Sequence, residues 1–152
     1  MSARYPMALR VALVREPTPE GPRPIVQAPA ELARLLLPMA RDEWDDGREH
    51  FGFVALSARH RVIGVCVVSI GCLTASLVHP REVFAPAIVA KAAAIALWHT
   101  HPSLDTEPSA EDLSLTRRLA AAGSLLGIKI VDHLVLAPDG SGFVSLKERG
   151  VL

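Results

Sequence analysis

The segment of residues 93–102 constrains the fold most strongly. It begins as the apolar run Ala-Ala-Ile-Ala-Leu-Trp and ends as His-Thr-His-Pro. A short, wholly apolar run of this kind is typical of a strand that is buried on both faces of a sheet. Proline cannot donate to a strand ladder, so Pro102 should stop the strand. We therefore predict a central strand over residues 93–101 with two histidines at its end.

These two histidines are spaced so that both can bind one metal ion. Residues i and i+2 of a strand point to the same face. Two such residues are separated by about 6.6 Å along the strand. The side chains of His99 and His101 can therefore converge at a strand end that opens to solvent. The alternative is a pair of histidines at a strand end that bind nothing.

A carboxylate follows on the next predicted helix. Ser109 is a favourable N-cap residue, and Gly127 is a favourable residue at which to end the helix. On a helical wheel of about 100° per residue, Asp112 heads the apolar stripe that contains Leu115 and Leu119. A buried carboxylate needs a partner, and a metal ion held by two histidines would be one. The alternative is a capping box in which Asp112 bonds back to the Ser109 N-cap.

The remaining pattern predicts an α/β fold in one domain, with a mixed sheet flanked by helices. Apolar and β-branched runs indicate strands, helical spacing of leucines and alanines indicates helices, and Pro-rich or Gly-rich stretches indicate loops. The predicted strands are 8–15, 51–57, 62–70, 73–78, 128–136 and 143–146, and the further helices are 29–39 and 79–92, with a proline-rich loop at 16–24.

Composition narrows the function classes. The chain has 152 residues, of which 50% are hydrophobic and 21% are charged, and this indicates a folded domain. Sixteen basic residues balance sixteen acidic ones, so we do not expect a nucleic-acid partner, while weak charge repulsion would permit a homodimer. No membrane span or targeting segment stands out, and we expect a cytoplasmic protein. Cys66 and Cys72 are expected to be buried free thiols.

The spacing of His-Thr-His-Pro and Ser109-x-x-Asp112 resembles the JAMM motif of MPN/JAB-domain metalloproteases. The wider sequence resembles the RadC-like branch, through VHPREVF, HTHPSLDTEPSAEDLSLTRRL, GSLLGIKIVDHLVL and the ending VSLKERGVL. The resemblance implies a three-layer αβα fold with a curled mixed sheet, similar to cytidine deaminase. Residues 25–152 would form the JAB/MPN domain, with residues 1–24 packed on it as a strand and loop.

The resemblance also implies an activity and its residues. The chain would be a zinc-dependent metallopeptidase or isopeptidase that hydrolyses an amide bond in a peptide or other amide-containing substrate. His99, His101 and Asp112 would bind Zn²⁺. Glu49 would take a proton from the attacking water and deliver it to the leaving amine, and Ser109 would hydrogen-bond the oxyanion. Spacing alone does not choose Glu49 over the nearby acids at positions 43, 45 and 46.

The sequence departs from the RadC-like pattern in two places. Thr100 and Leu104 replace the asparagine and glycine of the usual His-Asn-His-Pro-Ser-Gly, and Leu104 would reshape the loop over the site. The N-terminal helix-hairpin-helix region of full-length RadC proteins has no counterpart in these 152 residues. That region is the part of a RadC protein with a physical case for binding DNA, so its absence here weakens a role in DNA repair. The alternatives to a hydrolase are a non-enzymatic, zinc-stabilised interaction module and a factor associated with DNA repair.

Asp132 and His133 match a pair that recurs in RadC-like sequences. Adjacent residues of a strand point to opposite faces, so the two cannot both face the metal. One of them could orient a metal ligand from outside, although a structural role is favoured.

Overall fold

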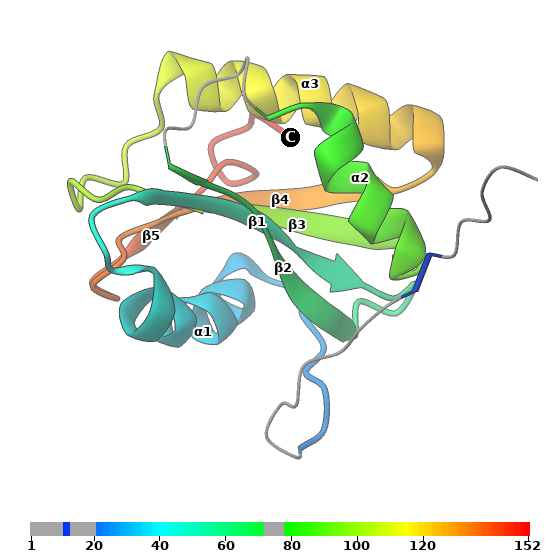
Figure 1. Ribbon diagram of the computed structural model, residues 1–152, viewed down its shortest axis with the longest axis horizontal. Coiled ribbons are helices and arrows are strands. Elements are labelled where there is room, and N and C mark those ends of the chain that lie inside the picture. The colour runs from blue at the N-terminus through cyan, green and yellow to red at the C-terminus, as the bar shows by residue number, and fades with distance from the viewer. Residues whose placement is uncertain (1–10, 13–20, 72–77) are drawn as a thin grey trace, which may run out of the picture.

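The computed structural model describes residues 11–12, 21–71 and 78–152, and its centre is a five-stranded sheet (Figure 1). The order across the sheet is β2-β1-β3-β4-β5. The strands are β1 (Glu49–Leu56), β2 (Val62–Gly71), β3 (Ala94–Thr100), β4 (Lys129–Leu136) and β5 (Phe143–Ser145). The predicted central strand is thus β3, which lies in the middle of the sheet.

The sheet is mixed, as predicted. β1 is antiparallel to both β2 and β3, and β4 is antiparallel to β5. β3 and β4 are parallel, because helix α3 (Ala110–Leu126) connects them as a crossover. This connection starts α3 near the carboxyl end of β3, where the two histidines lie.

Helices cover both faces of the sheet. α1 (Pro29–Met39) continues into the π-helical turn η1 (Ala40–Trp44) and packs on one face, whereas α2 (Pro80–Val89) and α3 pack on the other (Figure 1). β3 contributes to both cores, because Trp98 packs on the α1 side and Leu97 on the α3 side. The three-layer αβα fold is therefore confirmed.

Several predictions fall partly or wholly outside the described residues. Most residues of the predicted strands 8–15 and 73–78 lie outside the described part of the chain. The described residues of these two segments are Val11, Ala12 and Val78, and none of them has regular secondary structure. Cys72 is also outside the described residues. Cys66 is a free thiol, but it is half-buried on the edge strand β2, so the expectation of full burial is wrong for it. In the described part of the chain, no helix is long and apolar enough to cross a membrane.

Gly52 sets the distance between β1 and the aromatic core. It lies opposite Trp98 in the β1–β3 ladder, and the Trp98 ring stacks on Trp44 with centroids 3.9 Å apart. A Cβ at position 52 would lie 2.5 Å from Cζ2 of Trp98 and closer still to the backbone oxygen of Cys66. Only glycine leaves room for the indole over the strand.

We predict that Gly52→Ala lowers the free energy of unfolding by about 1–3 kcal/mol, the usual cost of overpacking a core. Urea denaturation measures this change. Gly64→Ala on β2 is the matched control, because a Cβ there would have no neighbour within 4 Å. Equal losses in the two variants would contradict the steric argument.

Candidate metal centre

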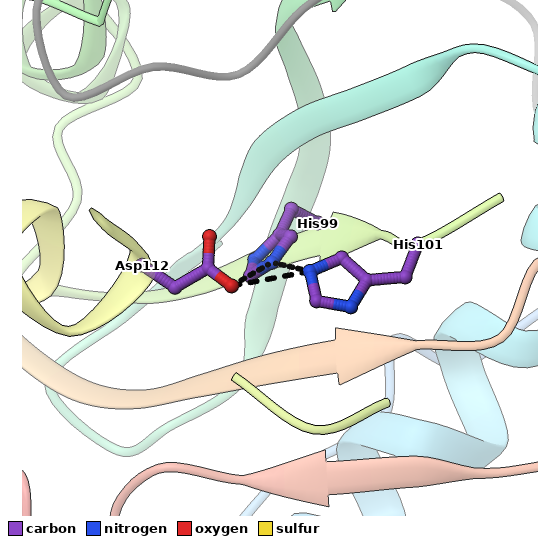
Figure 2. A group of neighbouring side chains, drawn as sticks. All are labelled: His99, His101 and Asp112. Carbon is purple, nitrogen blue, oxygen red and sulfur yellow. Dashed lines mark hydrogen bonds and ion pairs between the residues drawn. The ribbon is translucent and has the colours of Figure 1, made fainter. Parts of the chain in front are cut away.

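The side chains of His99, His101 and Asp112 meet at one point (Figure 2). His99 lies on β3, His101 follows its last residue, and Asp112 is in the first turn of α3. Nε2 of His99 is 2.9 Å from Nε2 of His101, and the two nitrogens lie 3.3 and 3.1 Å from Oδ2 of Asp112. The structure thus brings together the three residues that the strand period and the helical stripe selected.

Asp112 is at once a helix cap and a member of this cluster. Its Oδ2 accepts a hydrogen bond from the backbone N–H of Ser109 at 2.8 Å, and its own N–H donates to Oγ of Ser109 at 3.1 Å. This is the capping box that the sequence offered as an alternative. The two interpretations of Asp112 are therefore compatible, because one carboxylate oxygen serves both the cap and the histidines.

The electrostatics of the cluster keep Asp112 ionised. Burial would raise the pKa of this carboxyl, but the hydrogen bond with the protonated ring of His101 and the contact with His99 outweigh burial and leave the pKa far below its usual range. The same hydrogen bond to Asp112 raises the pKa of His101; burial opposes it, while the carbonyl oxygen of Asp105 and the charge of Glu49 support it.

The donor set fits a cation. Nδ1 of His101 lies 2.7 Å from the carbonyl oxygen of Asp105, which can only accept, so Nδ1 must carry a proton. In the neutral ring, Nε2 then carries a lone pair that faces the carboxylate of Asp112 and the other imidazole. Lone pairs that face one another repel unless a proton or a metal ion lies between them. Two imidazole nitrogens and one carboxylate oxygen are the protein ligands of an open, catalytic type of zinc site.

The strand register places Glu49 on the side of the sheet that faces this cluster. Phe51 lies opposite His99 in the antiparallel ladder, and side chains of opposed residues share a face. The alternation along β1 puts Glu49 on the same face as Phe51, and the charge of Glu49 raises the pKa of His101, which follows the last residue of β3. Asp46 instead contacts His50, whose side chain is on the other face. Tertiary pairing thus distinguishes Glu49 from a nearby acid; its proton-transfer role stays a prediction.

The loop between the ligands is held in a particular shape. His101 accepts from the backbone N–H of Leu104 through its carbonyl, and Leu104 has a φ of 67°, in the left-handed region that disfavours bulky side chains. This is the position at which the RadC-like pattern has glycine. Leu104 therefore keeps a glycine-like backbone and is a half-exposed apolar residue on the loop between His101 and Asp112. The oxyanion role of Ser109 stays a prediction, and its oxygen acts here as the N-cap.

Asp132 and His133 point to opposite faces, as predicted, and only His133 reaches the cluster. Nε2 of His133 is 2.8 Å from Nδ1 of His99, and burial first of all lowers the pKa of His133 well below its usual range. The carboxylate of Asp132 accepts from Oγ of Ser145 and from the backbone N–H of Lys147, so it anchors the C-terminal segment.

Thr116 is a buried polar residue that the sequence reasoning missed. Its Oγ1 is 2.6 Å from Nδ1 of His133 and 2.6 Å from the carbonyl oxygen of Asp112. The signal was available, because position 116 is one helical turn after Asp112 and lies on the same buried stripe.

Comparison with known proteins agrees with this geometry. The profile described as the RadC-like JAB domain matches residues 26–151. A UPF0758 protein of Desulfitobacterium hafniense is 45% identical over 130 residues, covering 86% of this chain and 55% of the relative. UPF0758 proteins of Moorella thermoacetica (48% over 130 residues; 86% and 55%) and Rubrobacter xylanophilus (42% over 150 residues; 99% and 62%) are also similar. The chain thus spans little more than half the length of these relatives.

We predict that the purified protein binds about one zinc ion per chain, as a three-ligand site should. His99→Ala combined with His101→Ala should lose it, which metal analysis after gel filtration would measure. His60→Asn is the control: it removes an imidazole from a turn and suits the positive φ at that position. Metal content unchanged in the double variant would exclude this cluster as the binding site.

Proposed function

Since this chain belongs to the RadC-like JAB domain family, we propose that it is a zinc-dependent hydrolase of amide bonds, of the metallopeptidase or isopeptidase type. One observation carries the proposal: ligand atoms of His99, His101 and Asp112 converge within 4.8 Å of one another. A structural zinc site would be closed by a fourth protein ligand, usually a cysteine. Among the described residues, this cluster has three ligands: His99, His101 and Asp112.

His99, His101 and Asp112 would hold the metal through Nε2, Nε2 and Oδ2, the atoms that face one another. Zinc bound there would polarise a substrate carbonyl and acidify an attacking water. The protein holds two of these ligands from outside the cluster: the carbonyl of Asp105 contacts His101, and the N–H of Ser109 donates to Asp112. His101 is the most exposed of the three, with 14% of its side chain accessible, so substrate would approach from its side.

Glu49 is the residue that would move the proton. It is partly exposed and begins β1, opposite the end of β3. Its carboxylate would accept a proton as the water oxygen attacks the carbonyl carbon, and would return that proton to the amine nitrogen as the C–N bond breaks. A carboxylate is suited to this exchange because the same oxygen can accept and then donate.

Ser109 and Leu104 would complete the substrate side. The Ser109 oxygen accepts the N–H of Asp112, which leaves its own hydrogen to donate to an oxyanion. Leu104 would contact an apolar group of a peptide substrate, because its side chain is 46% exposed on the loop between two ligands.

We predict that Glu49→Gln keeps zinc and the fold but slows amide hydrolysis by about 10²–10⁴-fold, the usual contribution of a general base. Mass spectrometry of a peptide and isopeptide library incubated with the zinc-loaded protein would measure the rate. Glu43→Gln is the matched control, because Glu43 is an exposed acid of η1, which packs on the α1 side of the sheet and not on the side of α3.

Two results would contradict the proposal. Equal cleavage by the Glu49→Gln and wild-type proteins would exclude Glu49 as the proton carrier. A wild-type protein that holds zinc yet cleaves no peptide or isopeptide bond would instead favour the non-enzymatic, zinc-stabilised module.

A further inference from the structure

We propose that His133 and Thr116 form a relay that fixes the tautomer of His99, so that the Nε2 lone pair of His99 points at the metal position. This inference rests on the proposed zinc function, and it assigns His133 and Thr116 as positioning residues. Neither touches the cluster centre; both act through His99. The relay is read from the directions of consecutive hydrogen bonds.

The first link begins at the backbone of α3. The carbonyl oxygen of Asp112 can only accept, so the hydroxyl of Thr116, 2.6 Å away, must donate to it. A hydroxyl has one hydrogen, which this bond uses. Oγ1 of Thr116 can then only accept from Nδ1 of His133, also 2.6 Å away. Nδ1 of His133 therefore carries a proton.

The second link is the hydrogen bond between His133 and His99. His133 is fully buried, and its two ring nitrogens contact a hydroxyl and another imidazole, neither of which is an anion. A charged ring buried between them would lack a counter-ion and would be costly. The neutral ring with its proton on Nδ1 has a lone pair on Nε2. Nδ1 of His99, 2.8 Å away, must then be the donor.

The third link reaches the metal position. A neutral imidazole that donates through Nδ1 has its lone pair on Nε2, and Nε2 of His99 faces Asp112 and His101. The neutral ring of His101 has the same tautomer, because its Nδ1 donates to the carbonyl oxygen of Asp105. Metal-bound histidines commonly donate their other N–H to a carboxylate or a carbonyl. For His99, the acceptor of this N–H is the ring of His133, which is itself oriented by Thr116.

The relay also closes on a ligand. It starts at the backbone of Asp112, passes through α3, β4 and β3, and returns to the side chain of Asp112 at the cluster. Each link from Asp112 to Nδ1 of His99 pairs one donor with one acceptor, as buried polar groups require, and Nε2 of His99 is left as an acceptor that faces the metal position. Thr100 is a second buried threonine near the cluster, but it belongs to the opposite face of the sheet. Its hydroxyl accepts from the backbone N–H of His50 and takes no part in the relay.

The test is Thr116→Val, which keeps the shape of the side chain and removes the hydroxyl. Without that acceptor, the proton of His133 should move to Nε2 and force the His99 proton onto its own Nε2, where it blocks the metal. Long-range ¹H–¹⁵N spectra of the metal-free protein should show this exchange. Zinc affinity, measured by competition with a chelating dye, should fall by about 10–100-fold.

Two variants control for simple loss of stability. Thr116→Ser restores the hydroxyl and should restore both the tautomer and the affinity. Thr100→Val removes a hydroxyl that is equally buried but outside the relay, so it should leave the tautomer of His99 unchanged and the affinity within about twofold.

The outcomes separate the relay from the proposed function. A wild-type spectrum with the His99 proton on Nε2 overturns the relay whether or not Thr116→Val folds. Unchanged tautomer and affinity in a folded Thr116→Val protein overturn it as well. If the wild-type protein binds no zinc, the proposed function fails, and the tautomer spectra alone still decide the relay.

Discussion

Three electron-pair donors that face one another are the feature on which the rest of this structure depends. Two imidazole nitrogens and a carboxylate oxygen lie within 3.3 Å of one another. Such a group is costly to bury without a cation or shared protons. The protein holds each donor from behind: the Asp105 carbonyl orients His101, the Ser109 N–H fixes Asp112, and His133 contacts His99.

The topology explains how these groups meet at one end of the strands, the end at which β3 finishes and β1 begins. In a β-α-β unit the helix begins at the carboxyl end of the first strand, so the N-terminal turn of α3, with Asp112, meets the end of β3. β1 is antiparallel to β3, so its first residue, Glu49, lies at this same edge. A parallel β1 would have carried Glu49 to the opposite end of the sheet.

The alternation along β3 separates chemistry from packing. Leu97 and His99 face α3 and the cluster, while Trp98 and Thr100 face α1. On the α1 side, the indole of Trp98 stacks on Trp44 and packs over Gly52 of β1. The aromatic layer on one face therefore supports the strand whose other face presents the ligands. The side chains that pack the aromatic layer and those that form the cluster therefore lie on different faces of β3.

The sequence by itself determined the features that depend on local periodicity. The strand period placed His99 and His101 on one face, and the helical period placed Asp112 on the buried stripe of α3. The order of these elements also indicated a mixed sheet between two helical layers. Each of these inferences needs only neighbours in sequence, because strands repeat every two residues and helices every 3.6.

Only the tertiary structure decided the features that depend on pairing between distant segments. The β1–β3 pairing brought Glu49 to the end of the sheet that carries the histidines, and it joins strands that are almost fifty residues apart in sequence. The contact of His133 and Thr116 with His99 required β3, β4 and α3 to be packed together. The half-exposure of Cys66 followed from β2 lying at an edge of the sheet. Local periodicity carries no information on which strands pair, because the register is set by long-range packing.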